Sequence, residues 1–116
     1  MEETGESNRV QMRKGVLEYS ILLILNSNDE YSSSIIQKLK DVDIIVAEGT
    51  VYPLLARLKN SGMLTYRWEE SLQGPPRKYY TITEQGKKQL AGLDCMWNDM
   101  AASINKLKTA SNHQAG

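Results

Sequence analysis

The chain has 116 residues, of which 41% are hydrophobic and 24% charged, and its fourteen basic residues balance its fourteen acidic residues. This composition is typical of one small folded domain, and it excludes a second large domain as well as a disordered or fibrous chain. Because the net charge is zero, only the local distribution of charge bears on a nucleic-acid partner.

The sequence offers little material for catalysis or for metal binding. The single cysteine, Cys95, excludes an internal disulfide and a thiolate zinc cluster, which fits a reducing compartment, so we expect a cytoplasmic protein. The longest aliphatic run, over residues 21–25, is far shorter than the roughly 20 residues that span a bilayer. The only histidine, His113, lies in a polar C-terminal segment without fixed neighbours, so we expect neither an enzyme nor a cofactor.

The N-terminal third predicts a flexible start and then a first helix. Residues 1–8 are polar and acidic, and we expect them to be frayed. From Met12 onward apolar residues recur at helical spacing, and the pattern stops at the turn cluster over residues 26–29. The residues predicted to form the apolar face are Met12, Val16, Tyr19, Leu23 and Ile24, joined by Leu17 and Ser20.

A short second helix and an edge strand are predicted next. Three serines, at 32–34, precede the apolar residues Ile35, Ile36 and Leu39, a pattern typical of a hydroxyl that caps a helix ending before Asp41. The β-branched run at residues 44–46 is too short for more than an edge strand.

A third helix follows, with a clear division between its two faces. Val51, Leu54, Leu55 and Leu58 have the spacing of a core face, and Gly62 stands where a helix end favours a left-handed residue. Small or flat side chains on the other face suit close approach to the DNA major groove, although any helix of a small bundle also has a solvated face. The residues of this outer face are Gly49, Thr50, Tyr52, Pro53, Ala56, Arg57 and Asn60.

Two strand-like runs, at residues 63–69 and 77–82, predict a β-hairpin with a long tip stiffened by two prolines. Three helices followed by a hairpin is the order of a winged helix. Between residues 49 and 80 there are five basic residues against two acidic ones, so this part of the neutral chain carries a charge of +3. Arg77 and Lys78 would grip a phosphate backbone at the hairpin; the alternative is an ordinary rigid turn with solvated charges.

The C-terminal part predicts a long helix, from Thr83 to Thr109, with a heptad seam. A helix of this length, roughly 40 Å at 1.5 Å per residue, is too long for the rest of the chain to cover its seam. We therefore expect the same helix of a second copy to cover it in a homodimer. The seam residues are Leu90, Leu93, Trp97, Met100, Ile104 and Leu107.

Several of these segments resemble one known family. GTVYPLLARLK, at 49–59, closely resembles the recognition-helix motif of the PadR family of bacterial transcriptional regulators, and it is followed by Gly62, Met63 and Leu64 in the expected place. GPPRKYY, at 74–80, and TEQG, at 83–86, are similar to the wing of that family and to the start of its C-terminal helix. KGVLE, at 14–18, resembles the opening of its first helix.

The resemblance implies a mainly α-helical fold with a small β-hairpin, a winged helix-turn-helix followed by a dimerisation helix. It divides the chain into a flexible segment (1–8), a winged-helix domain (9–82), a dimerisation helix (83–110) and a flexible tail (111–116). It further implies a sequence-specific repressor that binds an inverted-repeat operator in double-stranded DNA as a homodimer. The DNA contacts that it implies are Tyr31, Ser32, Thr50, Tyr52, Pro53, Arg57, Gly74, Arg77 and Lys78.

This chain departs from the family pattern at two places. The family commonly has a Tyr-Gly pair where this chain has Tyr31 and Ser32, and it commonly has a serine or similar cap where this chain has Ala47. Hydroxyls of the serines at 32–34 would compensate at the first place, because hydroxyls and amides at a helix start are good phosphate ligands.

The resemblance also leaves alternatives open. Some relatives are similar to drug sensors that hold a flat aromatic compound between tryptophans, which implies a small aromatic effector near Met96, Trp97 and Met100. The other interpretation is that Trp97 only packs in the dimer core. Two rival functions stay open. A protein-contact module is separated from a DNA binder by the salt dependence of binding. In a dimer that only sequesters a ligand, Trp97→Ala should abolish function while Arg77→Ala leaves it intact.

Overall fold

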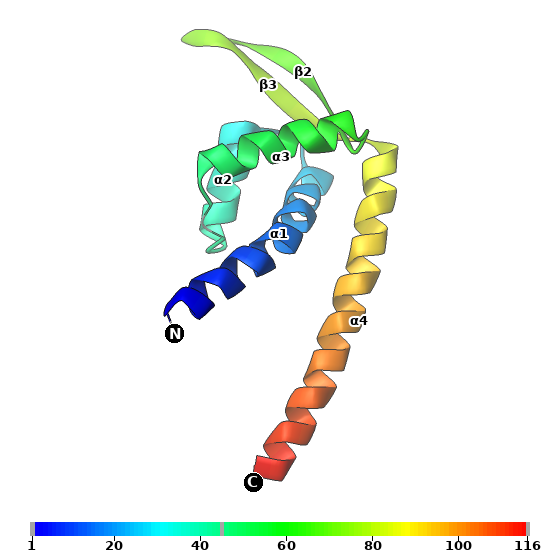
Figure 1. The fold of residues 1–116 in the computed structure, drawn as a ribbon. Coiled ribbons are helices and arrows are strands. Elements are labelled where there is room, and N and C mark those ends of the chain that lie inside the picture. The colour runs from blue at the N-terminus through cyan, green and yellow to red at the C-terminus, as the bar shows by residue number, and fades with distance from the viewer. Residues whose placement is uncertain (1, 45, 116) are drawn as a thin grey trace.

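The computed structural model describes residues 2–44 and 46–115, with side chains from 15 to 44 and from 46 to 111. It confirms a mainly helical fold with one small sheet and a long C-terminal helix. Figure 1 shows the hairpin standing above the helices and α4 running away from it. The elements are α1 (Glu2–Ser27), β1 (Glu30–Tyr31), α2 (Ser32–Asp41), α3 (Glu48–Asn60), β2 (Leu64–Ser71), β3 (Gly74–Ile82) and α4 (Glu84–Ala115).

One core joins the first three helices to one face of the sheet. The buried residues of α1 and α2 meet Val51, Leu55 and Leu58 of α3 and Leu64, Tyr80 and Ile82 of the sheet. Leu90 closes this core from the first part of α4. The core therefore fixes α3, the hairpin and the start of α4 as one unit.

The buried stripe of α1 differs from the predicted one. Leu17, Ile21 and Leu25 lie four residues apart and are buried together with Leu22, whereas Leu23, predicted to face the core, is exposed. Five consecutive aliphatic residues, at 21–25, precede the end of this helix, so periodicity does not select among them. The packing of α1 against α2, α4 and β3 makes the selection.

The predictions for the segment between α1 and α3 were wrong in two respects. The N-cap of α2 is Tyr31, which makes no side-chain capping hydrogen bond, and the three serines form the first helical turn instead. Ile44 and Val46 lie in a loop rather than in a strand, and Ile45 is outside the described residues. The edge strand is β1, whose two residues gain their pairing from β3 and carry no local strand signal.

The end of α3 matches its prediction closely. Gly62 has a φ of +84°, its N–H donates to the Lys59 carbonyl, and the N–H of Met63 donates to the Leu58 carbonyl. These two bonds form a Schellman motif, which only a residue tolerant of the left-handed region completes without strain. The motif turns the chain directly from α3 into β2.

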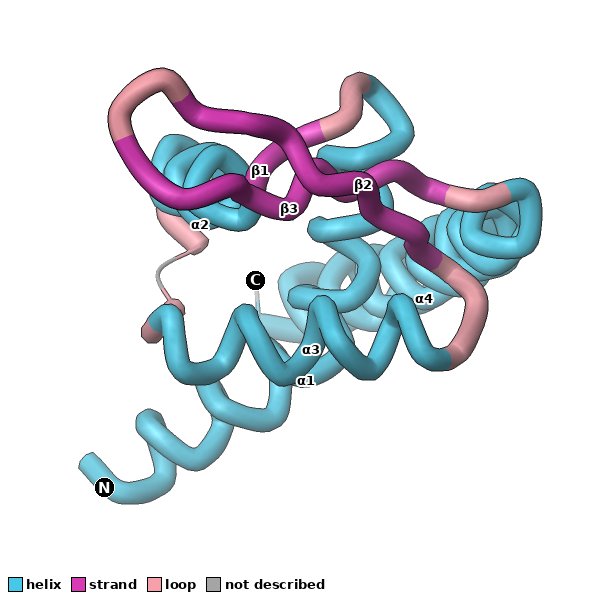
Figure 2. The backbone as a smooth tube through the Cα atoms, turned by 90° about the horizontal axis from the view of Figure 1, so that it is seen from above, coloured by secondary structure: helices cyan, strands magenta, loops and turns pink. Residues whose placement is uncertain are grey.

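The sheet has the strand order β1, β3, β2, and all of its pairs are antiparallel. Figure 2, seen from above, shows the hairpin reaching over α2 while α3 lies along the other side. The strands extend further than predicted: Ser71 pairs with Gly74, so the tip is only Leu72 and Gln73, and the expected long tip was wrong. Pro75 and Pro76 lie within β3 where the register shifts, as expected of residues that cannot donate to a ladder.

A compact junction ties the end of α3 to the start of α4. The Thr83 hydroxyl donates to the carbonyl oxygens of Gly62, at 2.6 Å, and of Met63, at 3.0 Å, and it accepts the N–H of Gly86 at 3.0 Å. Thr83 is therefore the N-cap of α4. Gly86 is buried against the Met63 carbonyl, so it is a packing position.

Both terminal helices are longer than predicted. α1 begins at Glu2, inside the segment expected to be frayed, and α4 continues to Ala115, inside the expected tail. Extending a helix costs little once a packed part has nucleated it, and acidic residues near its N-terminus favour it through the helix dipole.

The glycines of α4 give a matched pair of predictions. In Gly86→Ala the new methyl group would lie 2.2 Å from the Met63 carbonyl oxygen, so we expect a loss of about 2–3 kcal/mol in the free energy of unfolding. In Gly92→Ala the methyl group meets nothing within 4 Å, so we expect a gain of up to about 1 kcal/mol. Urea unfolding at one protein concentration measures both, and equal effects would contradict the close contact at Gly86.

Candidate nucleic-acid interface

The outer face of α3 is open along its whole length. Thr50, Tyr52, Pro53 and Arg57, the four candidates on this helix, are all exposed, while its opposite face is buried in the core. Apart from Tyr52, which is 45% exposed, the outer face carries no large apolar side chain. A surface of this kind can approach the floor of a groove closely.

The start of α3 has unoccupied backbone groups. Its N-cap, Ala47, makes no side-chain capping bond, so the first amides of the helix are open to an anion at its positive end. Pro53 lies at the sixth helical position, and it has no N–H for the carbonyl of Gly49. The first amides of α3 and the carbonyl oxygen of Gly49 are therefore available to a ligand.

Arg57 has a neighbour that sequence analysis missed. Its guanidinium lies 3.7 Å from the carboxylate of Glu18 on α1, while its side chain remains 61% exposed. An ion pair at this distance and exposure is weak, so Arg57 stays available for DNA. Its position is on the side of α3 that faces α1.

Arg77 and Lys78 lie on opposite faces of the hairpin. They are neighbours on β3, and side chains alternate along a strand. Gly74, the third candidate here, is the first residue of β3 and is exposed. Arg77 and Lys78 were predicted to grip a phosphate backbone together, but from opposite faces of the hairpin they cannot both contact one side of a ligand.

On the outward face of the sheet, cations and aromatic rings alternate. The Arg77 guanidinium lies 4.2 Å from the ring centroid of Tyr31, the rings of Tyr31 and Tyr79 are 4.7 Å apart, and the Arg67 guanidinium lies 4.5 Å from the ring of Tyr79. We call Arg77, Tyr31, Tyr79 and Arg67 the outer stack. Because Tyr31 begins α2, the outer stack fixes the hairpin to the helix-turn-helix.

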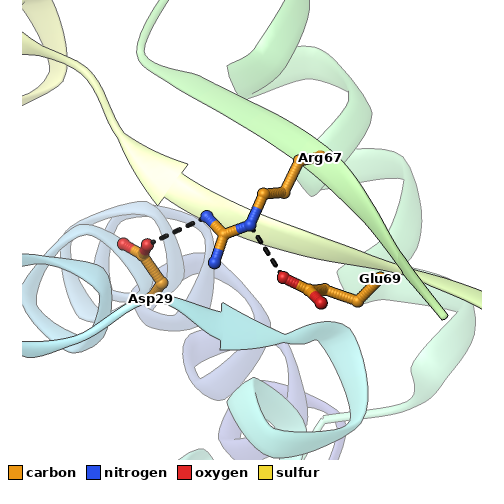
Figure 3. Close-up of polar contacts among 3 residues, drawn as sticks. All are labelled: Asp29, Arg67 and Glu69. Carbon is orange, nitrogen blue, oxygen red and sulfur yellow. Dashed lines mark hydrogen bonds and ion pairs between the residues drawn. The ribbon is translucent and has the colours of Figure 1, made fainter. Parts of the chain in front are cut away.

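Arg67 completes this attachment with two carboxylates. Figure 3 shows its side chain between Asp29 and Glu69, 2.8 Å from Glu69 and 3.5 Å from Asp29. The hydrogen bond to Glu69 is the main reason that the pKa of Arg67 lies above its usual value. Asp29 precedes β1, so Arg67 bridges from β2 to the chain that enters α2.

The face of the hairpin nearest α3 carries a second set of cations and rings. The Lys78 ammonium lies 4.6 Å from the ring of Tyr66 and 5.5 Å from that of Trp68, and the Lys59 ammonium lies 5.7 Å from the ring of Tyr66. We call Lys59, Tyr66, Lys78 and Trp68 the inner wing face. Sequence analysis did not select Lys59 or Trp68, although the alternation along residues 64–68 would have placed Trp68 beside Lys78.

Tyrosines gather where the inner wing face meets α3. Tyr80 is buried, and its pKa is raised by burial first and then by the nearby Tyr66 and Tyr52. Tyr52 of α3 thus lies close to the base of the hairpin. At the start of α2, Ser32 is half-buried and Tyr31 belongs to the outer stack, so of these two candidates Tyr31 has a structural role as well.

The predicted seam on α4 divides into two parts. Leu90 is buried in the chain's own core, and Leu93 packs against that core, so the prediction that Leu90 faces a partner was wrong. The last four seam residues, Trp97, Met100, Ile104 and Leu107, are all exposed by at least 44%. The apolar surface left for a partner therefore begins one heptad later than predicted.

Trp97 lies where α1 meets this exposed stretch. Its ring is 5.7 Å from that of Tyr19, whose hydroxyl donates a hydrogen bond to Asp94 and so has a raised pKa. A shallow hollow of about 250 Å³ is lined by Trp97, Met100, Ala101, Ile104, Asn105 and Lys108. Met96 is exposed outside this lining, and Cys95 is also exposed.

The described part of the chain shows no other chemical centre. Its His, Cys, Asp and Glu side chains form no group of three or more that could hold a metal ion, and His113 is outside the described side chains. Within the same residues, no helix is both long enough and apolar enough to cross a membrane.

Comparison with protein families and solved structures gives matches over most of the chain. Residues 21–92 match the model of the "transcriptional regulator PadR-like family". A PadR-like transcription factor from Bacteroides fragilis is 50% identical, with 87% of this chain and 98% of that chain covered and a TM-score of 0.75. A PadR-like regulator from Bacillus cereus is 37% identical, with 84% and 95% covered and a TM-score of 0.76.

One similar structure contains DNA. It is Bacillus subtilis PadR in complex with operator DNA, 28% identical, with 66% of this chain and 45% of that chain covered and a TM-score of 0.62.

The attachment of the hairpin can be tested at Arg67. Arg67→Ala removes two ion pairs and a ring contact from a half-exposed site, so we expect the free energy of unfolding to fall by about 1 kcal/mol. Arg67→Lys should recover little of this, because an ammonium lacks the planar fork that stacks and bridges. Lys88→Ala, an exposed control on α4, should change little in the same denaturation experiment. Full recovery by lysine would contradict this geometry.

Proposed function

The chain belongs to the PadR-like family of transcriptional regulators, whose members are DNA-binding regulators and not enzymes, and we propose that this member is a homodimeric repressor that occupies an inverted-repeat operator. It would act in the cytoplasm, by reversible binding at a promoter. The observation that carries the proposal is the outer face of α3, which is exposed, small and flat above a fully buried opposite face.

In this proposal α3 enters the major groove. Thr50, Tyr52 and Pro53 lie on its first turns, beside the uncapped amides that favour a phosphate, and Arg57 lies further along where a guanidinium can reach a base edge. Ser32, on the first turn of α2, is placed for a backbone phosphate. The hairpin lies beside α3 and follows the neighbouring part of the duplex.

The exposed seam on α4 supports the homodimer. Four apolar residues at heptad spacing are left in water on a helix of 32 residues, and the partner's α4 is the element whose pattern matches them. A two-fold axis through this seam relates two copies of α3. Such dimers set their recognition helices about one DNA turn apart, roughly 34 Å, which is why the operator would be an inverted repeat.

We also propose that an aromatic effector, where one acts, binds at Trp97. The hollow beside it is apolar and lined by α4, and the Trp97 ring also lies 5.7 Å from that of Tyr19 on α1, so a ligand that moves Trp97 would act on the contact between α4 and α1. Linkage then requires a compound that quenches Trp97 also to change DNA affinity. If a compound quenches Trp97 and leaves DNA affinity unchanged, the only remaining role of Trp97 is packing in the dimer interface.

Hydroxyl-radical footprinting of the region upstream of the gene tests the proposed function. We expect two protected half-sites on one face of the duplex, with centres about one helical turn apart. Protection without symmetry would contradict the inverted repeat, and no protection at low salt would contradict DNA binding itself.

Arg57 tests whether α3 reads bases. If its guanidinium contacts a guanine, Arg57→Ala should cost about 1–3 kcal/mol on the operator and relax the preference at one base pair of each half-site. A uniform loss on all sequences would show that Arg57 contacts only phosphate. Glu18→Gln is the matched control, because it removes the carboxylate that lies 3.7 Å from the Arg57 guanidinium and leaves Arg57 itself in place.

The dimer is tested by a charge placed in the seam. Ile104→Glu buries a carboxylate between two copies in the proposed dimer, so we expect a monomer in size-exclusion chromatography with light scattering and loss of operator binding. Ala102→Glu adds the same charge two residues earlier, off the seam, and should remain a dimer. A dimeric Ile104→Glu protein would overturn the proposed interface.

A further inference from the structure

The two faces of the hairpin differ in how their charges are balanced. On the outer stack, Arg67 is paired with Asp29 and Glu69, and Arg77 lies directly across from Glu69 in the strand register. On the inner wing face, Lys59 and Lys78 form no ion pair with any residue that the structure describes. Arg77 of the outer stack forms no ion pair with the described residues either, so the unpaired positive charge on the side facing α3 is that of these two lysines.

Carboxylates near the inner wing face do not change this balance. Glu30 shares that face of the sheet with Tyr80, but it is only 14% exposed and is paired with Lys38 at 2.7 Å. Glu70 lies at the irregular part of the register near the tip and is exposed to solvent. The two lysines thus lie next to aromatic rings and not next to acids.

Trp68 is the other unexplained feature of this face. It is 61% exposed, stands outside the hydrophobic core and pairs directly with Lys78 across the strands. Its ring meets that of Tyr66 edge-on at 5.9 Å, which holds the indole in place without burying it. A large ring held open beside the Lys78 ammonium, with the Lys59 ammonium over the neighbouring Tyr66 ring, has the chemistry that binds a sugar-phosphate chain, since phosphate requires the cations and deoxyribose the apolar surface.

We propose that the inner wing face holds one strand of the DNA backbone between the hairpin and α3, with Lys59 and Lys78 on phosphates and the Trp68 ring against the deoxyribose between them. This assignment rests on the proposed function and specifies which wing residues perform it. It makes Arg77 a positioning residue, which holds the hairpin through Tyr31 and does not neutralise a phosphate.

The charge assignment is tested by the salt dependence of binding to a duplex of the upstream region, followed by fluorescence anisotropy. Lys78→Ala should lower the slope of log affinity against log salt by about one for each protomer bound, and Lys59→Ala should do the same. Arg77→Ala should weaken binding and leave the slope unchanged. Lys106→Ala, an exposed control on α4, should change neither. A slope that falls with Arg77→Ala and not with Lys78→Ala would overturn the assignment.

Trp68 has a separate readout. In a Trp97→Phe background, first shown to keep the wild-type oligomeric state, Trp68 is the only tryptophan. Saturation with the duplex should reduce its quenching by acrylamide at least about twofold, and Trp68→Ala should weaken binding about tenfold per protomer while Trp68→Phe retains most of the affinity. Both variants should melt like the wild type, because the side chain is exposed.

The outcomes distinguish this inference from the proposed function. Wild-type binding with unchanged Trp68 quenching and unaffected Trp68→Ala would overturn the inference and leave the DNA-binding regulator standing; a protein partner would then be the occupant of this face. Absence of wild-type binding to the duplex at about 50 mM salt would overturn both.

Discussion

The close approach of Gly86 to the Met63 carbonyl is the constraint on which the rest of the structure depends. There the hydrogen bonds of one threonine, Thr83, join the end of α3, Met63 just before β2, and the first turn of α4. A side chain at position 86 would separate these elements. Because α3, the hairpin and α4 all leave from this point, their mutual orientation is set within the chain itself.

Apolar surface and charge have separate places on the two sides of this junction. The core below it is apolar and has no role in recognition beyond holding α3 at a fixed angle. The hairpin above it uses rings to hold cations, since Tyr31, Tyr79, Tyr66 and Trp68 each lie within 6 Å of a lysine or arginine. Rings restrain a long side chain without neutralising it, so a neutral protein can present a positive surface at one place.

Much of this was predictable because it follows from local pattern. Four features follow from rules that relate residues close together in the sequence. They are the buried face of α3, the left-handed Gly62, the hairpin and the heptad spacing in α4. The apolar stripe of α1 and the two-residue strand β1 did not follow from such rules. Which of the five consecutive aliphatic residues at 21–25 are buried depends on packing against three other elements, and Tyr31 is a strand residue only because Tyr79 lies beside it. For the same reason the pattern of the C-terminal helix does not reveal that Leu90 faces the chain's own core and that Gly86 is buried against Met63.

The central claim is that α3 and the hairpin together recognise a particular DNA sequence. The most direct measurement is fluorescence anisotropy of the wild-type protein with a labelled duplex of its own upstream region and with a scrambled duplex of the same composition, at about 50 and about 200 mM salt. The account predicts tight binding that prefers the native duplex and weakens steeply as salt rises. Equal, weak binding to both duplexes at both salt concentrations would contradict it.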